Sequence, residues 1–336
     1  PRTQLYRYLK DLPVAWRVCI SGTPIENSLE DLWSLMSLAV PGLLSSHSSF
    51  NEKFRRPIEA GRSPDLLNLL HSLIAPFVLR RTKEEVAPEL PERVETLLPV
   101  PLGRKQRQIY DRYLTRERAR LLHLELENDT RERFEVLAAL TRLRQLSLDP
   151  ALVDQRYDSV GSAKIDLLCE HLEQILPLGH KVLVFSQFVA FLERIRRSLD
   201  QRGIVSLLLE GKTRNRHAVI DEFQHGDVQV FLISLKAGGV GLTLTQADYV
   251  YMMDPWWNPS VEAQAVNRAH RIGQDRRVNV YRLVAQDTIE EKVCQLQAHK
   301  QLLVDSVVGQ NLGEGRSSTD IQQLLKLIQE DRDGRV

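Results

Sequence analysis

From Lys181 to Ala285 the sequence alternates short apolar, β-branched runs with segments of helical periodicity, and this alternation constrains the fold more than any other feature. The apolar runs predict strands at residues 182–185, 205–210, 228–234, 249–254 and 278–285. The helical segments cover residues 189–202, 216–224, 261–271 and 289–308. Such alternation requires right-handed crossovers onto a parallel sheet that is covered on both faces. We therefore predict a doubly wound α/β fold.

Upstream of residue 181 the regular alternation of apolar runs and helical segments is absent. Residues 102–126 and 131–148 read as two helices that are separated by a polar turn and form a helical insertion or lid. Closer to the start, residues 17–20 favour a short strand, the sequence from there to residue 75 is mostly helical, and residues 76–81 could form another strand.

The composition is that of an ordinary soluble globular protein, with 43% apolar and 26% charged residues among 336, enough for about two domains. The 45 lysines and arginines nearly balance 44 aspartates and glutamates, so a polyanionic partner would have to be met by a local patch of charge. No apolar run reaches the roughly 18 residues that a membrane helix needs. Cys19, Cys169 and Cys294 lie far apart without metal-ligand or disulfide spacing, so a reducing compartment is expected.

In an open parallel sheet the ligand site lies beyond the carboxyl ends of the strands. The loops after Ser234 and Asp254 are therefore the first places to look for one. The loop at 235–244 contains three glycines, which let backbone N–H groups approach a phosphate but more often mark a plain tight turn. The tripeptide GKT at 211–213 is not a phosphate-binding lysine loop, because that pattern needs a glycine at the position of Ser206.

Gln264, Arg268 and Arg271 have a spacing that would place all three on one face of the helix expected at 261–271. Two cations one turn apart repel each other unless an anion lies between them. One interpretation is a solvated face whose positive charges favour a helix C-terminus. The other is a phosphate clamp of the arginine-finger type, because a guanidinium binds phosphate oxygens with two parallel donors and stays charged.

The segment that begins at Gly103 is strongly basic, with seven cations against Asp111 and Glu117. The cations are Arg104, Lys105, Arg107, Arg112, Arg116, Arg118 and Arg120. A charge run is usually a solvated helix face, but Tyr110 and Tyr113 are interleaved with it, so a surface for nucleic acid or a protein partner is the alternative. The aromatic pair in DPWWNP, at 254–259, indicates packing under a turn.

Several stretches along nearly the whole chain are distinctive when they are taken together. Before the expected sheet they are SGTPIENSLEDLWSL, FVLRRTKEEVAPELPER and LTRLRQLSLDPAL. Within it they are KVLVFSQF, ISLKAGGVGLTLTQAD, DPWWNP and EAQAVNRAHRIGQ, and TIEEKVCQLQAHKQLL follows it. In order and spacing these stretches closely resemble the motifs of Swi/Snf-type ATP-dependent DNA translocases of helicase superfamily two, and the last of them is similar to the family's brace-like helix.

The resemblance implies two RecA-like lobes that close on ATP and Mg²⁺, with the phosphates and the metal held by a lysine loop and an acidic box that this sequence lacks. By position, the arginines Arg268 and Arg271 resemble the family's γ-phosphate fingers, and Gln264 assists them. Other matching positions imply nucleotide binding or coupling by Gly239, Gly241, Asp254 and Trp257, and DNA binding by Thr23, Ser186, Gln187 and Lys236. No residue of this chain is implied as a metal ligand.

The resemblance also divides the chain into four parts. It implies the end of the first lobe with a linker at 1–93, the start of the second lobe with a helical protrusion at 94–158, the second RecA-like lobe with the brace-like helix at 159–310, and a flexible linker with a last helix at 311–336. Thr243 departs from the family pattern, since asparagine is common there, and the shortened stretch after Gly211 leaves the role of Arg216 open.

The function predicted from these features is that of a C-terminal helicase-lobe portion of a double-stranded DNA translocase or remodelling ATPase. By itself the chain is expected to be inactive as an ATPase, because both phosphate-binding motifs are missing. The expected partners are duplex DNA, contacted through its backbone, and a DNA-bound protein cargo, with no membrane contact and a monomeric state. The expected location is cytoplasmic in a prokaryote and nuclear in a eukaryote. The alternatives are a non-catalytic DNA-binding or protein-docking module, and a strand-separating DNA or RNA helicase.

Overall fold

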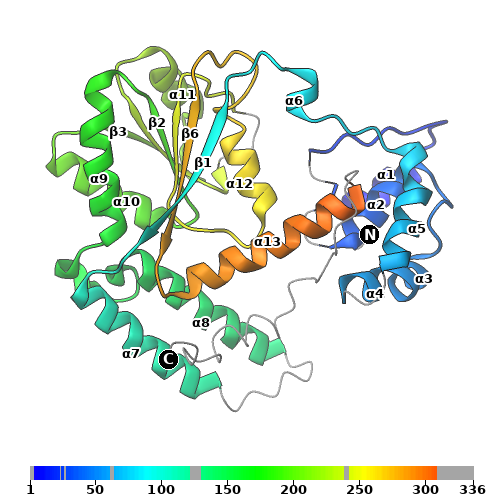
Figure 1. Cartoon of the computed structure of the whole chain (residues 1–336), viewed down its shortest axis with the longest axis horizontal. Coiled ribbons are helices and arrows are strands. Elements are labelled where there is room, and N and C mark those ends of the chain that lie inside the picture. Colours follow the sequence, from blue (N-terminus) through cyan, green and yellow to red (C-terminus); the bar gives the residue numbers. More distant parts are fainter. Residues whose placement is uncertain are drawn as a thin grey trace. The chain divides into compact units, whose positions relative to one another are not determined.

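The computed structural model describes residues 4–22, 24–25, 28–60, 64–121, 130–237 and 242–308. Two compact units emerge within this part of the chain (Figure 1). The first comprises the residues before 87 together with 258–260 and the second half of the last described helix, and the second comprises the remaining residues from 87 to 294. The division lies next to the linker that the two prolines at 88–91 predict.

The first unit is helical, as expected for residues 21–75. Its helices are α1 (Gln4–Asp11), α2 (Leu29–Ala39), α3 (His47–Phe50), α4 (Arg56–Glu59), α5 (Pro64–Ile74) and α6 (Lys83–Val86), with a π-helical turn at Asn51–Arg55 and a 3₁₀ turn at Ala75–Phe77. Ser28 caps α2 by accepting a hydrogen bond from the Glu30 backbone at 3.2 Å, and Phe50 and Leu70 are fully buried in the core of this unit.

The strands predicted at 17–20 and 76–81 were wrong. Residues 17–20 are irregular, and residues 76–81 form the end of a 3₁₀ turn followed by irregular chain. A strand is stabilised by hydrogen bonds to a neighbouring strand, and the described residues of this unit contain no strand to supply them.

The second unit contains a six-stranded parallel sheet, which confirms the predicted α/β fold. Its strands are β1 (Arg93–Val100), β2 (Val182–Ser186), β3 (Ser206–Leu209), β4 (Val230–Ser234), β5 (Tyr249–Met252) and β6 (Val278–Ala285). They are arranged in the order β1-β6-β5-β2-β4-β3, with every neighbouring pair parallel. Strands β3 and β4 lie on one side of β2, and the later strands β5 and β6 lie on the other, so the strand order reverses at the centre of the sheet.

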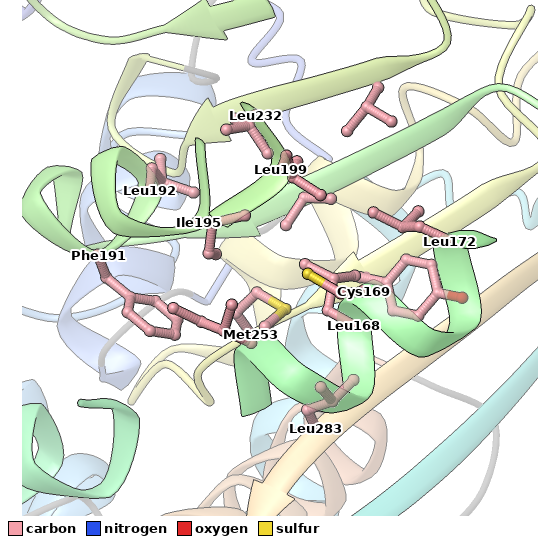
Figure 2. Packing of buried hydrophobic residues seen from close by; sticks show 14 of the residues in the cluster. Leu168, Cys169, Leu172, Phe191, Leu192, Ile195, Leu199, Leu232, Met253 and Leu283 are labelled. Atoms are coloured by element: carbon pink, nitrogen blue, oxygen red, sulfur yellow. The ribbon is translucent and has the colours of Figure 1, made fainter. Parts of the chain in front are cut away.

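Alternating side chains of each central strand enter two different cores. Val182 and Val184 of β2 pack in a cluster with residues of α9 (Ala163–Ile175) and α10 (Val189–Gln201), and the residues of this cluster are drawn in Figure 2. Leu183 and Phe185 pack on the opposite face. That face is covered by α11 (Arg216–His225) and α12 (Pro259–Val266). A sheet buried on both sides explains why its strands are continuous apolar runs.

Two helices between β1 and β2 form an antiparallel pair, α7 (Arg104–Leu121) and α8 (Thr130–Leu148), which run side by side in Figure 1. They confirm the predicted helical insertion, although residues 122–129 are outside the described part. After the sheet, α13 (Ile289–Val308) matches the predicted brace-like helix. Short 3₁₀ turns occur at Pro150–Leu152, Gln155–Val160 and Leu176–Leu178. Among the described residues, no helix has both the length and the apolar character needed to cross a membrane.

The prediction missed β1, which pairs with β6 along its full length, from Arg93 opposite Val278 to Val100 opposite Ala285. This strand lies at the edge of the sheet, and most of its side chains are exposed on both faces. Its sequence therefore lacks the apolar run that marks the buried strands. Helix α9 was also not predicted, and the last helix expected at 320–329 lies outside the described residues.

Candidate functional site

The carboxyl ends of β2 and β4 are closed by two buried serines. Ser186 and Ser234 are paired in register, and each side chain accepts a hydrogen bond from the backbone two or three residues later, Phe188 N at 3.1 Å and Ala237 N at 3.2 Å. Ser186 is fully buried. Its side chain shapes the turn after β2, and the DNA contact predicted for it stays a prediction.

Gln187 and Asp254 meet at the same edge of the sheet. The Gln187 backbone donates to Asp254 Oδ1 at 3.3 Å, and the Asp254 side chain is buried with 1% exposure. The Gln187 side-chain nitrogen Nε2 is buried and has no hydrogen-bond partner among the described residues. Lys236, two residues beyond β4, is exposed. The structure thus brings four of the predicted residues, Ser186 included, to one edge, while Thr23, Gly239 and Gly241 lie outside the described residues.

A residue that the sequence analysis did not single out, Arg144 of α8, lies at the centre of this edge. It donates to the Pro255 carbonyl at 2.6 Å and lies 3.5 Å from Asp254 Oδ2. Its guanidinium carbon is 5.4 Å from the Trp256 ring and 5.1 Å from the Trp257 ring. Burial lowers the pKa of Arg144, and the Asp254 carboxylate opposes that shift. The tryptophan pair is therefore packed around a buried cation.

Replacing Arg144 with methionine is expected to lower the free energy of unfolding by about 2 kcal/mol, because the buried Pro255 carbonyl would lose its donor and Asp254 its nearby cation. Urea denaturation of the chain measures this change. Arg156→Met is a matched control, since its ion pair with Asp154 is at the surface and should contribute little. A change of equal size in both variants would contradict the structural role of Arg144.

The three residues of the predicted arginine site are not on one helix face, and that prediction was wrong. Helix α12 ends at Val266, so Gln264 is helical while Arg268 and Arg271 follow in turns. Beyond Val266 the backbone carbonyls accept hydrogen bonds from other segments, in place of those that would continue the helix. The Leu244 backbone donates to the Arg268 carbonyl at 2.9 Å, and Gln274 Nε2 donates to the Ala269 carbonyl at 3.1 Å.

The arginines also lie away from the carboxyl edge of the sheet. Helix α12 starts after β5 and leads back to β6, so it runs opposite to the strands. The connection from β4 to β5 also leads from the carboxyl edge of the sheet back to its amino edge. Leu244 of this connection packs in the core that α12 covers. The segment after α12 meets this loop, as the bond between Leu244 and Arg268 shows. The site is therefore on the α12 face of the sheet.

Arg268 is a buried cation that forms no ion pair among the described residues. Its exposure is 7%, and its Nε and Nη1 atoms have no hydrogen-bond partner among the described residues. Burial lowers the pKa of Arg268, and the positive charge of Arg271 lowers it further. Arg271 is itself exposed and donates to Thr243 Oγ1 at 3.1 Å. Two neighbouring guanidinium groups, one of them desolvated and unpaired, favour a multiply charged anion such as a polyphosphate.

No group of His, Cys, Asp and Glu side chains that could hold a metal ion is found in the described part of the chain. The predicted site residues thus form two places, the arginine pair with Thr243 on the α12 face and the Asp254 cluster at the carboxyl edge. The exposed Gln264 lies between them on α12.

The sequence of this chain matches the models of known protein families. Residues 1–152 match the SNF2-related domain, and residues 163–273 match the helicase conserved C-terminal domain. The putative ATP-dependent helicase/translocase YwqA of Bacillus subtilis is 34% identical over 335 residues, which cover 97% of this chain and 36% of that protein. Protein CHROMATIN REMODELING 24 of Arabidopsis thaliana is 33% identical over 360 residues, covering 89% of this chain and 32% of that protein.

Among solved structures, the Sulfolobus solfataricus SWI2/SNF2 ATPase core in complex with dsDNA is similar with a TM-score of 0.56 and 31% identity, covering 98% of this chain and 69% of that one. The chain spans about a third of the length of the curated relatives it matches. Sequence, domain order and fold agree across nearly all of its residues. The chain therefore belongs to the SNF2 family of ATP-dependent helicases and remodelling ATPases.

Proposed function

We propose that this chain supplies the second lobe of a double-stranded DNA translocase, in which Arg268 and Arg271 contact the phosphates of ATP held by a preceding lobe. The observation that carries the proposal is the buried guanidinium of Arg268 beside Arg271, with two nitrogens that have no hydrogen-bond partner in the described part of the chain. A buried cation without a partner lowers stability, so such a group is retained where an anion neutralises it in another state. Closure of two lobes on ATP provides that anion.

The residues present fit ATP phosphates but not Mg²⁺. Phosphoryl transfer requires a metal ion and a phosphate cradle as well as arginines. The described residues contain no acidic cluster, and the sequence contains no lysine loop of the phosphate-binding type. In our proposal, the segments that hold Mg²⁺ and the β-phosphate belong to a part of the first lobe that this chain does not contain.

The proposed partner is the backbone of duplex DNA at the carboxyl edge of the sheet. Lys212 and Arg214 follow β3 and are exposed, and Lys236 follows the neighbouring strand β4. Three cations on one edge can neutralise phosphates without reading bases. The Sulfolobus solfataricus relative, whose structure contains dsDNA, supports this partner. In the same proposal, a DNA-bound protein is the cargo.

The proposal is tested by ATP hydrolysis in a two-lobe protein, in which this chain follows the remainder of a first RecA-like lobe. Turnover is compared without nucleic acid and with single-stranded DNA, duplex DNA or RNA. We expect strong stimulation by duplex DNA, and negligible hydrolysis by the 336-residue chain alone. Equal rates in all four conditions would contradict the proposal and point to a docking module, whereas stimulation by RNA or by forked substrates with unwinding would point to a helicase.

Thr243 provides a milder test of the arginine site. Thr243→Val keeps the shape of the side chain but removes the hydroxyl that accepts the hydrogen bond from Arg271. Arg271 would then lose a positioning contact while keeping its charge, so we expect kcat of the two-lobe protein to fall about tenfold at most. Thr243→Ser retains the hydroxyl and should retain turnover. Equal losses in both variants would show that the bond to Arg271 is not what matters at this position.

A further inference from the structure

The basic helix α7 is fixed at its base to the second unit. The Arg107 side chain donates to the Asp287 carbonyl at 2.9 Å, in the turn between β6 and α13. The Tyr110 hydroxyl accepts a hydrogen bond from the Ile289 backbone at 2.8 Å, and Tyr110 is 1% exposed. Both contacts belong to the first two turns of the helix. The rest of α7 therefore extends from a rigid base, alongside α8 (Figure 1).

The inner face of α7 has its acidic charge neutralised by α8. Arg142 donates to both carboxylate oxygens of Glu117, each at 2.9 Å, and Glu117 is 4% exposed. The remaining acidic residue of the helix, Asp111, lies 3.6 Å from Arg107. Neither carboxylate is left to offset the cations on the outer face.

The outer face of α7 is rich in cations. The exposed ones are Arg104, Lys105, Arg112, Arg116 and Arg120. Arg104, Arg112, Arg116 and Arg120 stand at multiples of four residues, in a row that Gln108 interrupts and that winds by about 160° across the exposed face over about 24 Å. Among the described residues, Arg120 is the one member of this row that forms an ion pair, at 3.6 Å from Glu135.

The row suits a polyanion better than a protein surface. Protein interfaces have apolar cores that are depleted in charge, whereas α7, all of which the structure describes, exposes no large apolar side chain. Nucleic acid interfaces are polar and positively charged. Duplex DNA presents about one phosphate charge per 1.7 Å of its axis, so a row of this length can meet several phosphates at once.

The position of α7 separates this row from the cations beyond β3 and β4. Helix α7 follows the carboxyl end of β1, which is four strands from β4 in the sheet order. With strands about 4.8 Å apart, the two groups of cations are separated by about 19 Å along the same edge. We propose that the outer face of α7 is a second binding surface for the phosphate backbone of duplex DNA. The inference rests on the proposed function, because it takes duplex DNA as the partner.

Anisotropy of a labelled 30-base-pair duplex, titrated with the 336-residue chain between about 50 and 200 mM salt, tests the inference. The α7 variant replaces Arg104, Arg112 and Arg116 with glutamine, which keeps helix propensity. If each arginine neutralises one phosphate, the slope of log K against log salt falls by about 2.7, and affinity at 0.1 M salt falls at least tenfold. A control variant with glutamine at the exposed Arg196, Arg197 and Arg277 has the same change in charge and should bind like the wild type.

A third variant, with glutamine at Lys212, Arg214 and Lys236, separates the inference from the proposed function. If the wild-type chain does not bind duplex DNA, both the proposed function and the inference fail. The inference alone is overturned under three joint results. The wild type binds duplex DNA, the third variant binds it more weakly, and the α7 variant keeps the wild-type slope. An α7 variant that binds duplex normally but loses binding to poly-glutamate would also overturn it, and would assign the surface to an acidic protein.

Discussion

Replacing Arg268 with methionine in the two-lobe protein is expected to lower ATP turnover on the order of 10³-fold, as for other arginine fingers, while the Kd for duplex DNA stays within about twofold. Turnover is lost because the guanidinium no longer stabilises charge on the transferred phosphate. Arg271→Ala should have the same effect, since the two groups contact the same anion in the proposed site. Steady-state hydrolysis and DNA binding, measured side by side, provide the test.

The stability of the Arg268→Met variant distinguishes a ligand-binding arginine from a structural one. Two buried nitrogens of Arg268 have no partner among the residues that the structure describes, and burial lowers its pKa, so its charge is expected to destabilise the chain when no anion is present. We expect Tm of the variant chain to be unchanged or raised. A lower Tm, or equal losses of DNA binding and turnover, would show that Arg268 is a structural residue or a DNA contact.

Replacing Lys164 with methionine is expected to lower the free energy of unfolding of the chain by about 3–5 kcal/mol. Lys164 is fully buried and donates to the Met253 carbonyl at 2.6 Å, the Leu283 carbonyl at 2.8 Å and Glu290 Oε2 at 2.6 Å. Without it, the Glu290 carboxylate remains buried and uncompensated. Urea denaturation measures the loss, and Lys164→Met combined with Glu290→Leu should recover more than half of it, because both charges are then removed.

The same variant should be sensitive to pH. Burial raises the pKa of Glu290, and the nearby Lys164 ammonium opposes the rise. Removing Lys164 therefore raises this pKa further. A carboxyl with a raised pKa in the folded state loses stability as the pH rises above its unfolded value of about 4.3, so the destabilisation should be smaller at pH 5 than at pH 8. Equal destabilisation at both values would show that the carboxylate is not the source of the cost.

The buried strands were predictable because burial on both faces leaves a signal in the sequence itself. Residues 278–285 and 289–308 were predicted with the bounds that β6 and α13 have. The exposed strand β1 has no such signal, since its pairing with β6 is what makes it a strand. The end of α12 was unpredictable for a related reason, because the hydrogen bonds that end it come from Leu244 and Gln274.

The candidate site, like the fold, was predictable from the sequence only in part. Spacing indicated Arg268 and Arg271 as a pair, and their proximity agrees with it, although they are not on a helix face. Arg144 was missed because its partner Asp254 is 110 residues away and only the fold brings them together. The sole sequence signal for it was the family-like segment LTRLRQLSLDPAL, which indicated a motif but not a contact.

The pairing of β1 with β6 has a consequence for synthesis of the protein. The first strand of the sheet to leave the ribosome pairs with the last one, so β1 remains without its partner while the residues between them are made. At translation rates of about 5–20 residues per second, that interval lasts roughly 10–40 s. An unpaired strand is prone to aggregate during this time, and Arg93, Glu95 and Pro99 are residues of the kind that oppose such pairing.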